Sequence, residues 1–182
     1  MLAECADRRD PADELAAALE RAGVEDALVV DDTAGREGLW RLREGHTEAI
    51  NAAGVPHKLD VGVPLARLGR FLAEVPGAVE RAAPGARTVL FGHLGDGNVH
   101  VNVLGLEPDD YEVDEAILRL AADCGGTISA EHGVGVAKAA WLHLIRPPGE
   151  LAAMAAIKAA LDPRGILNPG AVLAPGTAPP PR

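Results

Sequence analysis

The chain has 182 residues, of which 48% are hydrophobic and 24% charged, and this composition suits one domain with its own apolar core. Acidic residues outnumber basic ones by 27 to 17, so the formal net charge is −10, which argues against a protein that binds nucleic acid. Cys5 and Cys124 are too few for a disulfide framework, and the sequence offers neither a basic signal-peptide region nor a membrane-spanning apolar run. We therefore expect a cytoplasmic protein.

Helices and strands are predicted to alternate in the first half of the chain. Proline in a first helical turn and glycine after the last turn are the usual start and stop signals. They predict helices from Asp10-Pro11 to about Ala22, over residues 35–53, and from Pro64 to about Ala82. Short apolar runs predict strands at residues 1–4, 27–30 and 57–61.

The second half begins with a predicted hairpin. Residues 87–92 and 99–104 are rich in β-formers and flank Asp96-Gly97, a strong hairpin signal. Helices are predicted over residues 109–123, 136–144 and 149–161. The four prolines of residues 174–182 predict a disordered tail.

These elements predict an α+β fold, in which helices cover an antiparallel sheet mainly on one face. We expect one domain over residues 1–173, and the abrupt first strand suggests that the sheet lacks strands upstream. An exposed sheet edge of that kind invites cover by a partner or by a second copy of the chain.

Histidines and one carboxylate gather in two glycine-rich segments. His93 and His100 flank the hairpin turn from opposite strands, and Glu131 lies in a separate loop. Two imidazoles and one carboxylate can bind zinc, manganese or iron and leave positions open for a substrate. The alternative is an ordinary hairpin turn with surface or core histidines, and the spacing alone does not exclude it.

Four ordered blocks resemble the C-terminal domain of FAD-linked oxidases, a group that includes D-lactate, glycolate and D-2-hydroxyglutarate dehydrogenases. The blocks are residues 39–65, residues 92–103 (GHLGDGNVHVNV), residues 125–135 (GGTISAEHGVG) and residues 157–172 (IKAALDPRGILNPGAV). The resemblance implies a ferredoxin-like cap domain. It also implies oxidation of a 2-hydroxyacid with transfer of hydride to flavin.

The resemblance also implies roles for individual residues near the hairpin and beyond it. His93, His100 and Glu131 would be metal ligands, with zinc the expected metal, and His132 would be the general base. Asn168, in the Asn-Pro-Gly turn, would lie toward the flavin ring, although a plain helix-ending turn explains it equally well.

Four further residues would hold the substrate. Arg43 and Thr47 are four residues apart on a predicted helix, and Lys58 and Asn102 lie in predicted strands. In the D-2-hydroxyglutarate dehydrogenase branch of the family, which this sequence resembles most, the positions matching Arg43, Thr47 and Lys58 hold substrate carboxylates. By this resemblance Arg43 would take one carboxylate, and Lys58 and Asn102 would help at the second carboxylate or at the 2-oxygen. Arginine, lysine and threonine suit that task, although Arg43 by itself also fits a solvated helix face.

No segment matches the strand, glycine-rich turn and helix that cradle a pyrophosphate, so we expect FAD to be bound mainly by a domain outside this chain. The chain would then be a fragment or a separately encoded subunit, inactive without a flavin-binding partner. Two alternatives remain: a metal-dependent hydrolase that works alone, and a non-catalytic module that binds a metal or a hydroxyacid.

Overall fold

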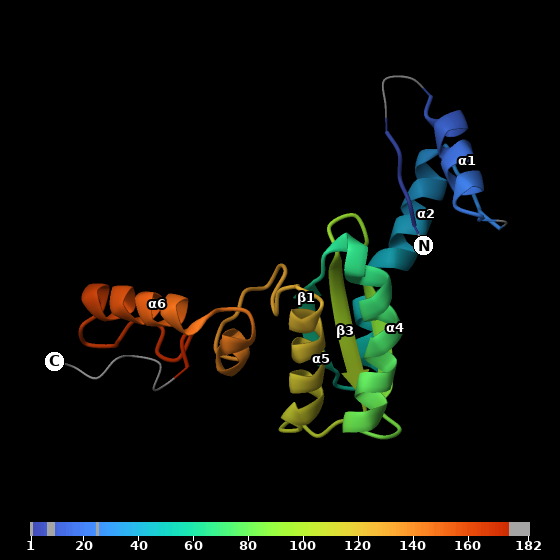
Figure 1. Ribbon diagram of the computed structural model, residues 1–182. Helices are drawn as coiled ribbons and strands as arrows, with labels where there is room; N and C mark the ends of the chain where they lie inside the picture. The colour runs from blue at the N-terminus through green and yellow to red at the C-terminus, as the bar shows by residue number, and fades with distance from the viewer. Residues whose placement is uncertain (1, 7–9, 25, 175–182) are drawn as a thin grey trace. The chain divides into compact units, whose positions relative to one another are not determined.

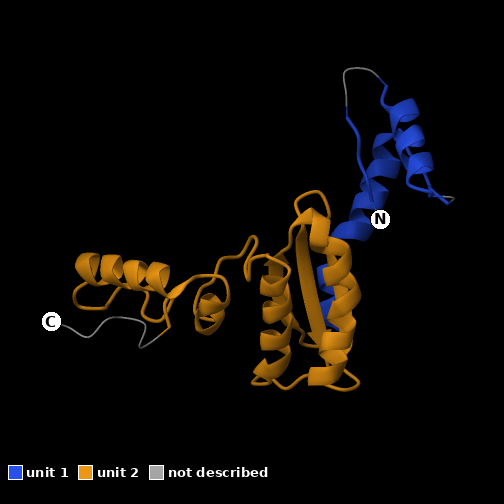
Figure 2. Ribbon diagram, viewed as in Figure 1, with its two compact units in different colours: residues 1–52 blue, residues 53–182 orange. Residues whose placement is uncertain are grey.

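A computed structural model describes residues 2–6, 10–24 and 26–174. The chain divides into two compact units, residues 1–52 and 53–182 (Figures 1 and 2). The first unit is helical, and the second holds the sheet. That residues 1–173 form one domain stays a prediction.

The first unit contains α1 (Ala12–Arg21), α2 (Thr33–Glu44) and the start of α3 (His46–Ala53). Asp32 caps α2, because its Oδ1 accepts a 2.8 Å hydrogen bond from the backbone N–H of Gly35. The prediction of one helix over residues 35–53 was wrong, since Gly45 separates α2 from α3. Gly45 keeps a right-handed helical φ of −67°, so the interruption is confined to one residue.

Neither strand predicted for the first unit is present among the described residues. Residues 2–6 and 26–31 have no regular structure, and Met1 lies outside the described residues. A strand is stable only when its backbone pairs with another strand, and in this unit the described residues provide no such partner.

The second unit is built on a three-stranded antiparallel sheet, as far as the described residues go. Its strands are β1 (His57–Gly62), β2 (Arg87–His93) and β3 (Asn98–Leu104), and their order is β1-β3-β2. The predicted hairpin is confirmed: β2 and β3 are joined by residues 94–97. Gly97 takes a φ of +73°, a left-handed conformation that favours glycine.

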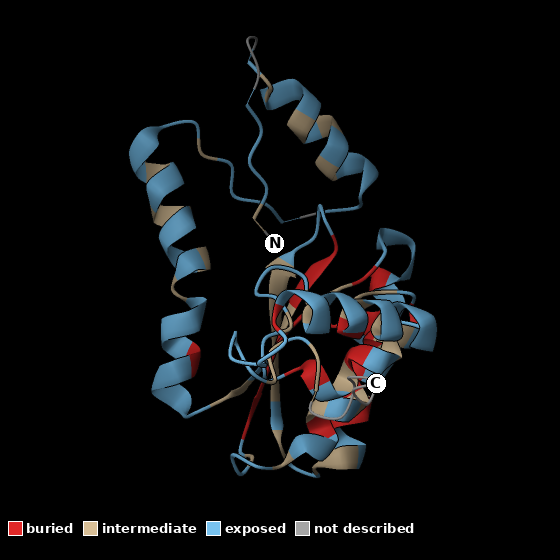
Figure 3. Ribbon diagram, turned by 90° about the vertical axis from the view of Figure 1, so that its left-hand side faces the viewer, coloured by how far each residue is buried: buried red, intermediate tan, exposed pale blue. Residues whose placement is uncertain are grey.

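Helices α4 (Leu65–Ala82) and α5 (Tyr111–Asp123) pack side by side on one face of this sheet (Figure 1). Buried apolar residues recur every three or four positions on most of α4, and the core valines Val99, Val101 and Val103 occupy every second position of β3, as the helix and strand periodicities require. Figure 3 shows the resulting buried layer along the strands. The largest side chains in this core are Phe71, Ile117, Leu118 and Ile128. The predicted α+β class is therefore confirmed.

After the sheet, the chain forms η1 (Ala139–Leu144) and α6 (Pro148–Leu161). The prediction of a helix from residue 136 was wrong, because residues 135–138 form turns and η1 is a short 3₁₀ helix. Asp162 ends α6 and accepts hydrogen bonds from the backbone N–H groups of Ile166 and Leu167. The tail predicted to be disordered lies outside the described residues, apart from Ala174.

None of the helices in the described ranges is both long and apolar enough to cross a membrane. The cytoplasmic location stays a prediction.

Candidate metal and substrate site

The two faces of the sheet differ in chemistry because alternate residues of a strand point to opposite sides. On β3, Val99, Val101 and Val103 are buried in the core beneath α4 and α5. Asn98, His100 and Asn102 alternate with these valines and therefore lie on the opposite side of the sheet. We call this side the polar face.

Strand register places three further residues on the polar face. Asp60 pairs with His100, and Lys58 pairs with Asn102, across β1 and β3. His93 pairs with Asn98 across the hairpin. Paired residues in an antiparallel sheet lie on the same face, so the register alone assembles this polar cluster.

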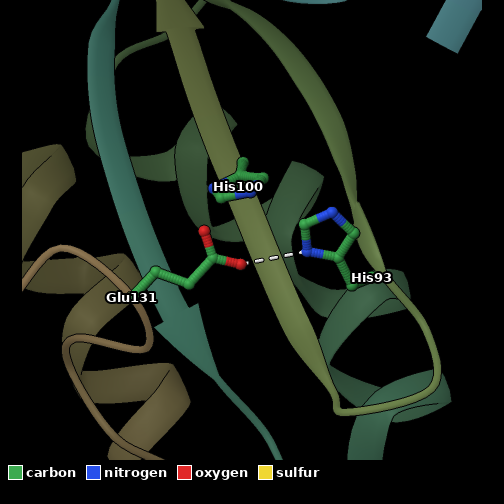
Figure 4. Close-up of side chains that lie close together, drawn as sticks. All are labelled: His93, His100 and Glu131. Carbon is green, nitrogen blue, oxygen red and sulfur yellow. Dashed lines mark hydrogen bonds and ion pairs between the residues drawn. The ribbon is translucent and has the colours of Figure 1, made fainter. Parts of the chain in front are cut away.

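Within this cluster His93 and His100 meet Glu131 of the loop that follows α5 (Figure 4). One ligand atom from each of the three side chains lies within 4.8 Å of the others. His93 Nδ1 is 3.0 Å from Glu131 Oε1, and the two imidazole centroids are 5.8 Å apart. Two nitrogens and one carboxylate oxygen at this spacing fit a divalent transition metal with open positions.

His100 is the least exposed of these three side chains. Burial lowers the pKa of His100, and the charges of Asp60 and Glu131 offset this effect only in part. The ring is therefore neutral at pH 7, and the neutral form is the one that binds metals.

Asp60 holds the loop that carries Glu131. Its Oδ2 accepts hydrogen bonds from three consecutive backbone N–H groups, those of Ala130 (3.1 Å), Glu131 (2.7 Å) and His132 (3.0 Å). Burial by itself would raise the pKa of Asp60, but the N–H groups of His132 and Glu131 and the charge of Lys138 outweigh it. The pKa is therefore lowered, and the carboxylate stays ionised.

Lys138 fixes the far end of the same segment. Its buried Nζ donates a 2.8 Å hydrogen bond to the backbone carbonyl of Asp60. Burial lowers the pKa of Lys138, while the charges of Asp60 and Asp114 act in the opposite direction. The loop is thus anchored to β1 at two points, through the backbone N–H groups of residues 130–132 and through Lys138.

Asn98 holds the carboxylate of the candidate ligand Glu131. Its side-chain Nδ2 donates to Glu131 Oε1, and only 3% of the residue is exposed. The sequence analysis assigned no role to Asn98, Asp60 or Lys138. The available signals were that Asp60 lies two residues from Lys58 on one strand, and that Lys138 is one of only three lysines.

His132, the predicted base, lies beside the cluster. Its side chain is 69% exposed, and its ring stacks on His100 with centroids 5.9 Å apart and an interplanar angle of 26°. Its Nε2 is 4.0 Å from Glu131 Oε2. An exposed imidazole next to a candidate metal site is accessible to a bound substrate.

The predicted substrate residues fall into two groups. Lys58 and Asn102 are neighbours on the polar face, and Asn102 is buried although its Nδ2 has no hydrogen-bond partner in the described ranges. Arg43 lies on α2 and Thr47 on α3, both in the first unit. The structure thus groups Lys58 and Asn102 with the cluster and describes Arg43 and Thr47 within their own unit.

Asn168 lies in a turn after α6 and has a φ of +44°. A few residues on, Val172 adopts a φ of +67°, which is strained for a β-branched side chain. Its N–H donates a 2.7 Å hydrogen bond to the carbonyl of Gly135, in the segment between His132 and Lys138. The turn containing Asn168 is therefore tied to the loop of the candidate site.

The sheet, its one-sided helical cover and the His–His–Glu cluster together define an α+β domain organised around a polar sheet face. The chain belongs to the family described as the C-terminal domain of FAD linked oxidases, whose model matches residues 3–172.

Among curated proteins the chain is similar to D-2-hydroxyglutarate dehydrogenases. It is 39% identical over 171 residues to the one from Xanthomonas citri pv. viticola, covering 88% of this chain and 36% of that protein. It is 37% identical over 158 residues to the mitochondrial one of Arabidopsis thaliana, covering 85% and 28%. For the mitochondrial one of Bos taurus the identity is 40% over 162 residues, covering 80% and 28%. The chain thus spans 36% or less of the length of these relatives.

Proposed function

We propose that this chain supplies the metal- and substrate-binding part of an FAD-dependent dehydrogenase that oxidises a D-2-hydroxyacid to the 2-oxoacid. The observation that carries the proposal is the convergence of His93, His100 and Glu131 on the polar face, with His132 beside them. The family match and the names of the relatives support the redox chemistry and favour D-2-hydroxyglutarate as the substrate.

His93, His100 and Glu131 would hold the metal, for which we propose zinc because three ligands of these types leave a catalytic site open. When bound, the metal supplies a Lewis acid for the 2-hydroxyl group and the flavin supplies a two-electron acceptor. His132 accepts the proton of that hydroxyl, the usual role of an imidazole at neutral pH.

The remaining polar residues bind and orient the substrate. Lys58 and Asn102, paired across β1 and β3, offer an ammonium and an amide beside the metal cluster. Arg43 and Thr47 add a guanidinium and a hydroxyl for a second carboxylate. Asn168 contacts the flavin, and the hydrogen bond between Val172 and Gly135 supports this placement because it ties that segment to the site loop.

Partner requirements follow from the chemistry. A hydride leaving the 2-carbon needs an acceptor held against it, so we propose that a flavin-binding domain or subunit completes the enzyme.

The test is to combine the purified chain with a separately produced flavin domain and measure dye reduction by D-2-hydroxyglutarate. His132→Asn should lower kcat by about 10²–10⁴-fold, because it removes the base. The matched control is His143→Asn, at an exposed histidine whose Nδ1 bonds the carbonyl of Ala140. Equal rates in both variants would contradict the assigned base, and metal-dependent ester cleavage without flavin would favour a hydrolase.

A further inference from the structure

Asp60 contacts both halves of the candidate metal site. It lies on β1 directly opposite His100 and is only 4% exposed. Its two carboxylate oxygens have different surroundings. Oδ2 receives the three loop N–H groups described above, whereas Oδ1 is buried 3.5 Å from His100 Nδ1. Within the described ranges Oδ1 has no hydrogen-bond partner.

The position of Oδ1 favours one of the two tautomers of His100. An ionised carboxylate can only accept hydrogen bonds, so Oδ1 favours a proton on His100 Nδ1. A movement of roughly half an ångström brings these atoms to a normal hydrogen-bond distance. In that tautomer Nε2 keeps its lone pair and is the nitrogen available to a metal. A carboxylate behind a metal-binding histidine fixes its tautomer and ring orientation in this way.

The same carboxylate also fixes the loop that carries the other candidate ligand, Glu131. Because Oδ2 holds three consecutive N–H groups, a shift of the backbone that carries Glu131 and His132 would weaken these hydrogen bonds. His100 comes from the sheet and Glu131 from the loop, and Asp60 sets the position of both.

We propose that Asp60 is the positioning residue of the metal site, holding His100 with Nε2 toward the metal while it fixes the loop of Glu131. The inference rests on the proposed metal site and assigns Asp60 no contact with the metal or the substrate.

Asp60→Asn separates the two tasks of the carboxylate. The three N–H groups of the loop select the amide oxygen, so the amide NH₂ must point toward His100. An NH₂ donor in that position disfavours the Nδ1–H form and moves the proton to Nε2, where it blocks the metal. The loop stays anchored through the amide oxygen.

Asp114→Asn is the matched control. Asp114 Oδ1 lies 3.1 Å from His57 Nδ1, so this variant also neutralises an Asp–His pair within the second unit. His57 lies on β1, but an odd number of positions from Asp60, and therefore on the opposite side of the sheet.

Two measurements on the 182-residue chain test the proposal. Zn²⁺ affinity, measured by competition with a chelator, should fall about 10–100-fold in Asp60→Asn and stay within about twofold of wild type in Asp114→Asn. Histidine ¹⁵N NMR of the metal-free wild type should show the His100 proton on Nδ1, and in Asp60→Asn it should move to Nε2.

Unchanged Zn²⁺ affinity in Asp60→Asn, or a His100 proton on Nε2 in the wild type, would overturn the proposal. The wild-type spectrum gives a decision even where Asp60→Asn does not fold. A wild-type chain that binds no Zn²⁺ would refute the proposed metal site, and the tautomer of His100 would still decide the role of Asp60.

Discussion

Lys138 Nζ donates a 2.8 Å hydrogen bond to the backbone carbonyl of Asp60, 78 residues earlier in the chain. This bond joins the segment that follows the site loop to the middle of β1, so the loop is closed at its base by a buried ammonium group. A buried ammonium group makes the free energy of unfolding depend on pH.

The first prediction concerns that dependence. Burial lowers the pKa of Lys138 in the folded chain below its ordinary value of 10.5, whereas the unfolded chain keeps that value. Between the two pKa values the unfolded state binds more protons, so stability rises with pH across this window. As the pH is raised from 7 to 11, the free energy of unfolding of the wild type should increase relative to that of Lys138→Met. Parallel profiles would contradict this.

The second prediction concerns metal content. The purified chain should carry about one zinc, and His100→Ala should lose most of it, because two ligands no longer suffice for a stable site. His143→Ala is the control, since it removes an exposed histidine outside the cluster. Elemental analysis of the three proteins decides the matter, and equal zinc in all of them would refute the ligand set.

The third prediction concerns the hairpin turn. A Cβ on Gly97 would lie 2.0 Å from the carbonyl oxygen of Val63, and the φ of +73° is strained for any other residue. Gly97→Ala should therefore lower the free energy of unfolding by at least about 2 kcal/mol. Gly95→Ala, two residues away, meets no atom within 4 Å and should cost less than about 0.5 kcal/mol. Urea denaturation of both variants compares them, and similar midpoints would count against a strict requirement at Gly97.

The fourth prediction concerns substrate preference. In the metal-loaded chain combined with a flavin domain, D-2-hydroxyglutarate should bind more tightly than D-lactate, because its second carboxylate gains a charged partner. Arg43→Ala should weaken D-2-hydroxyglutarate binding by about 1.5–3 kcal/mol, the range for hydrogen bonds to charged groups. Arg41→Ala, on the same helix, is the control. Calorimetry that found tighter D-lactate binding would overturn the preference.

The sequence predicted the second unit better than the first. The strands β1, β2 and β3 and the helices α4 and α5 appear within two residues of their expected bounds, because each has a clear apolar period and a clear turn beside it. The predictions of strands at residues 1–4 and 27–30 failed because a strand needs a pairing partner, and local composition does not reveal whether the fold supplies one.

The candidate ligands could be expected from the hairpin, but their supports could not. That His93 and His100 approach each other follows from the turn between them. The contacts of Asp60 with three N–H groups and a ring nitrogen depend on a register and a loop path that only the folded chain fixes. Resemblance to a family identifies residues that touch a ligand more readily than those that hold them in place.

The alternation along β3 makes this strand intolerant of any change in length. Even-numbered positions from Asn98 to Asn102 carry the polar chemistry, and Val99, Val101 and Val103 carry the hydrophobic packing. Inserting a single residue before Val99 would exchange the two sets, burying an imidazole under the helices and turning valines toward the candidate ligands His93 and Glu131. An insertion of one residue would therefore disrupt the hydrophobic core and the candidate site together. Substitutions, or insertions of two residues, keep the alternation of the strand.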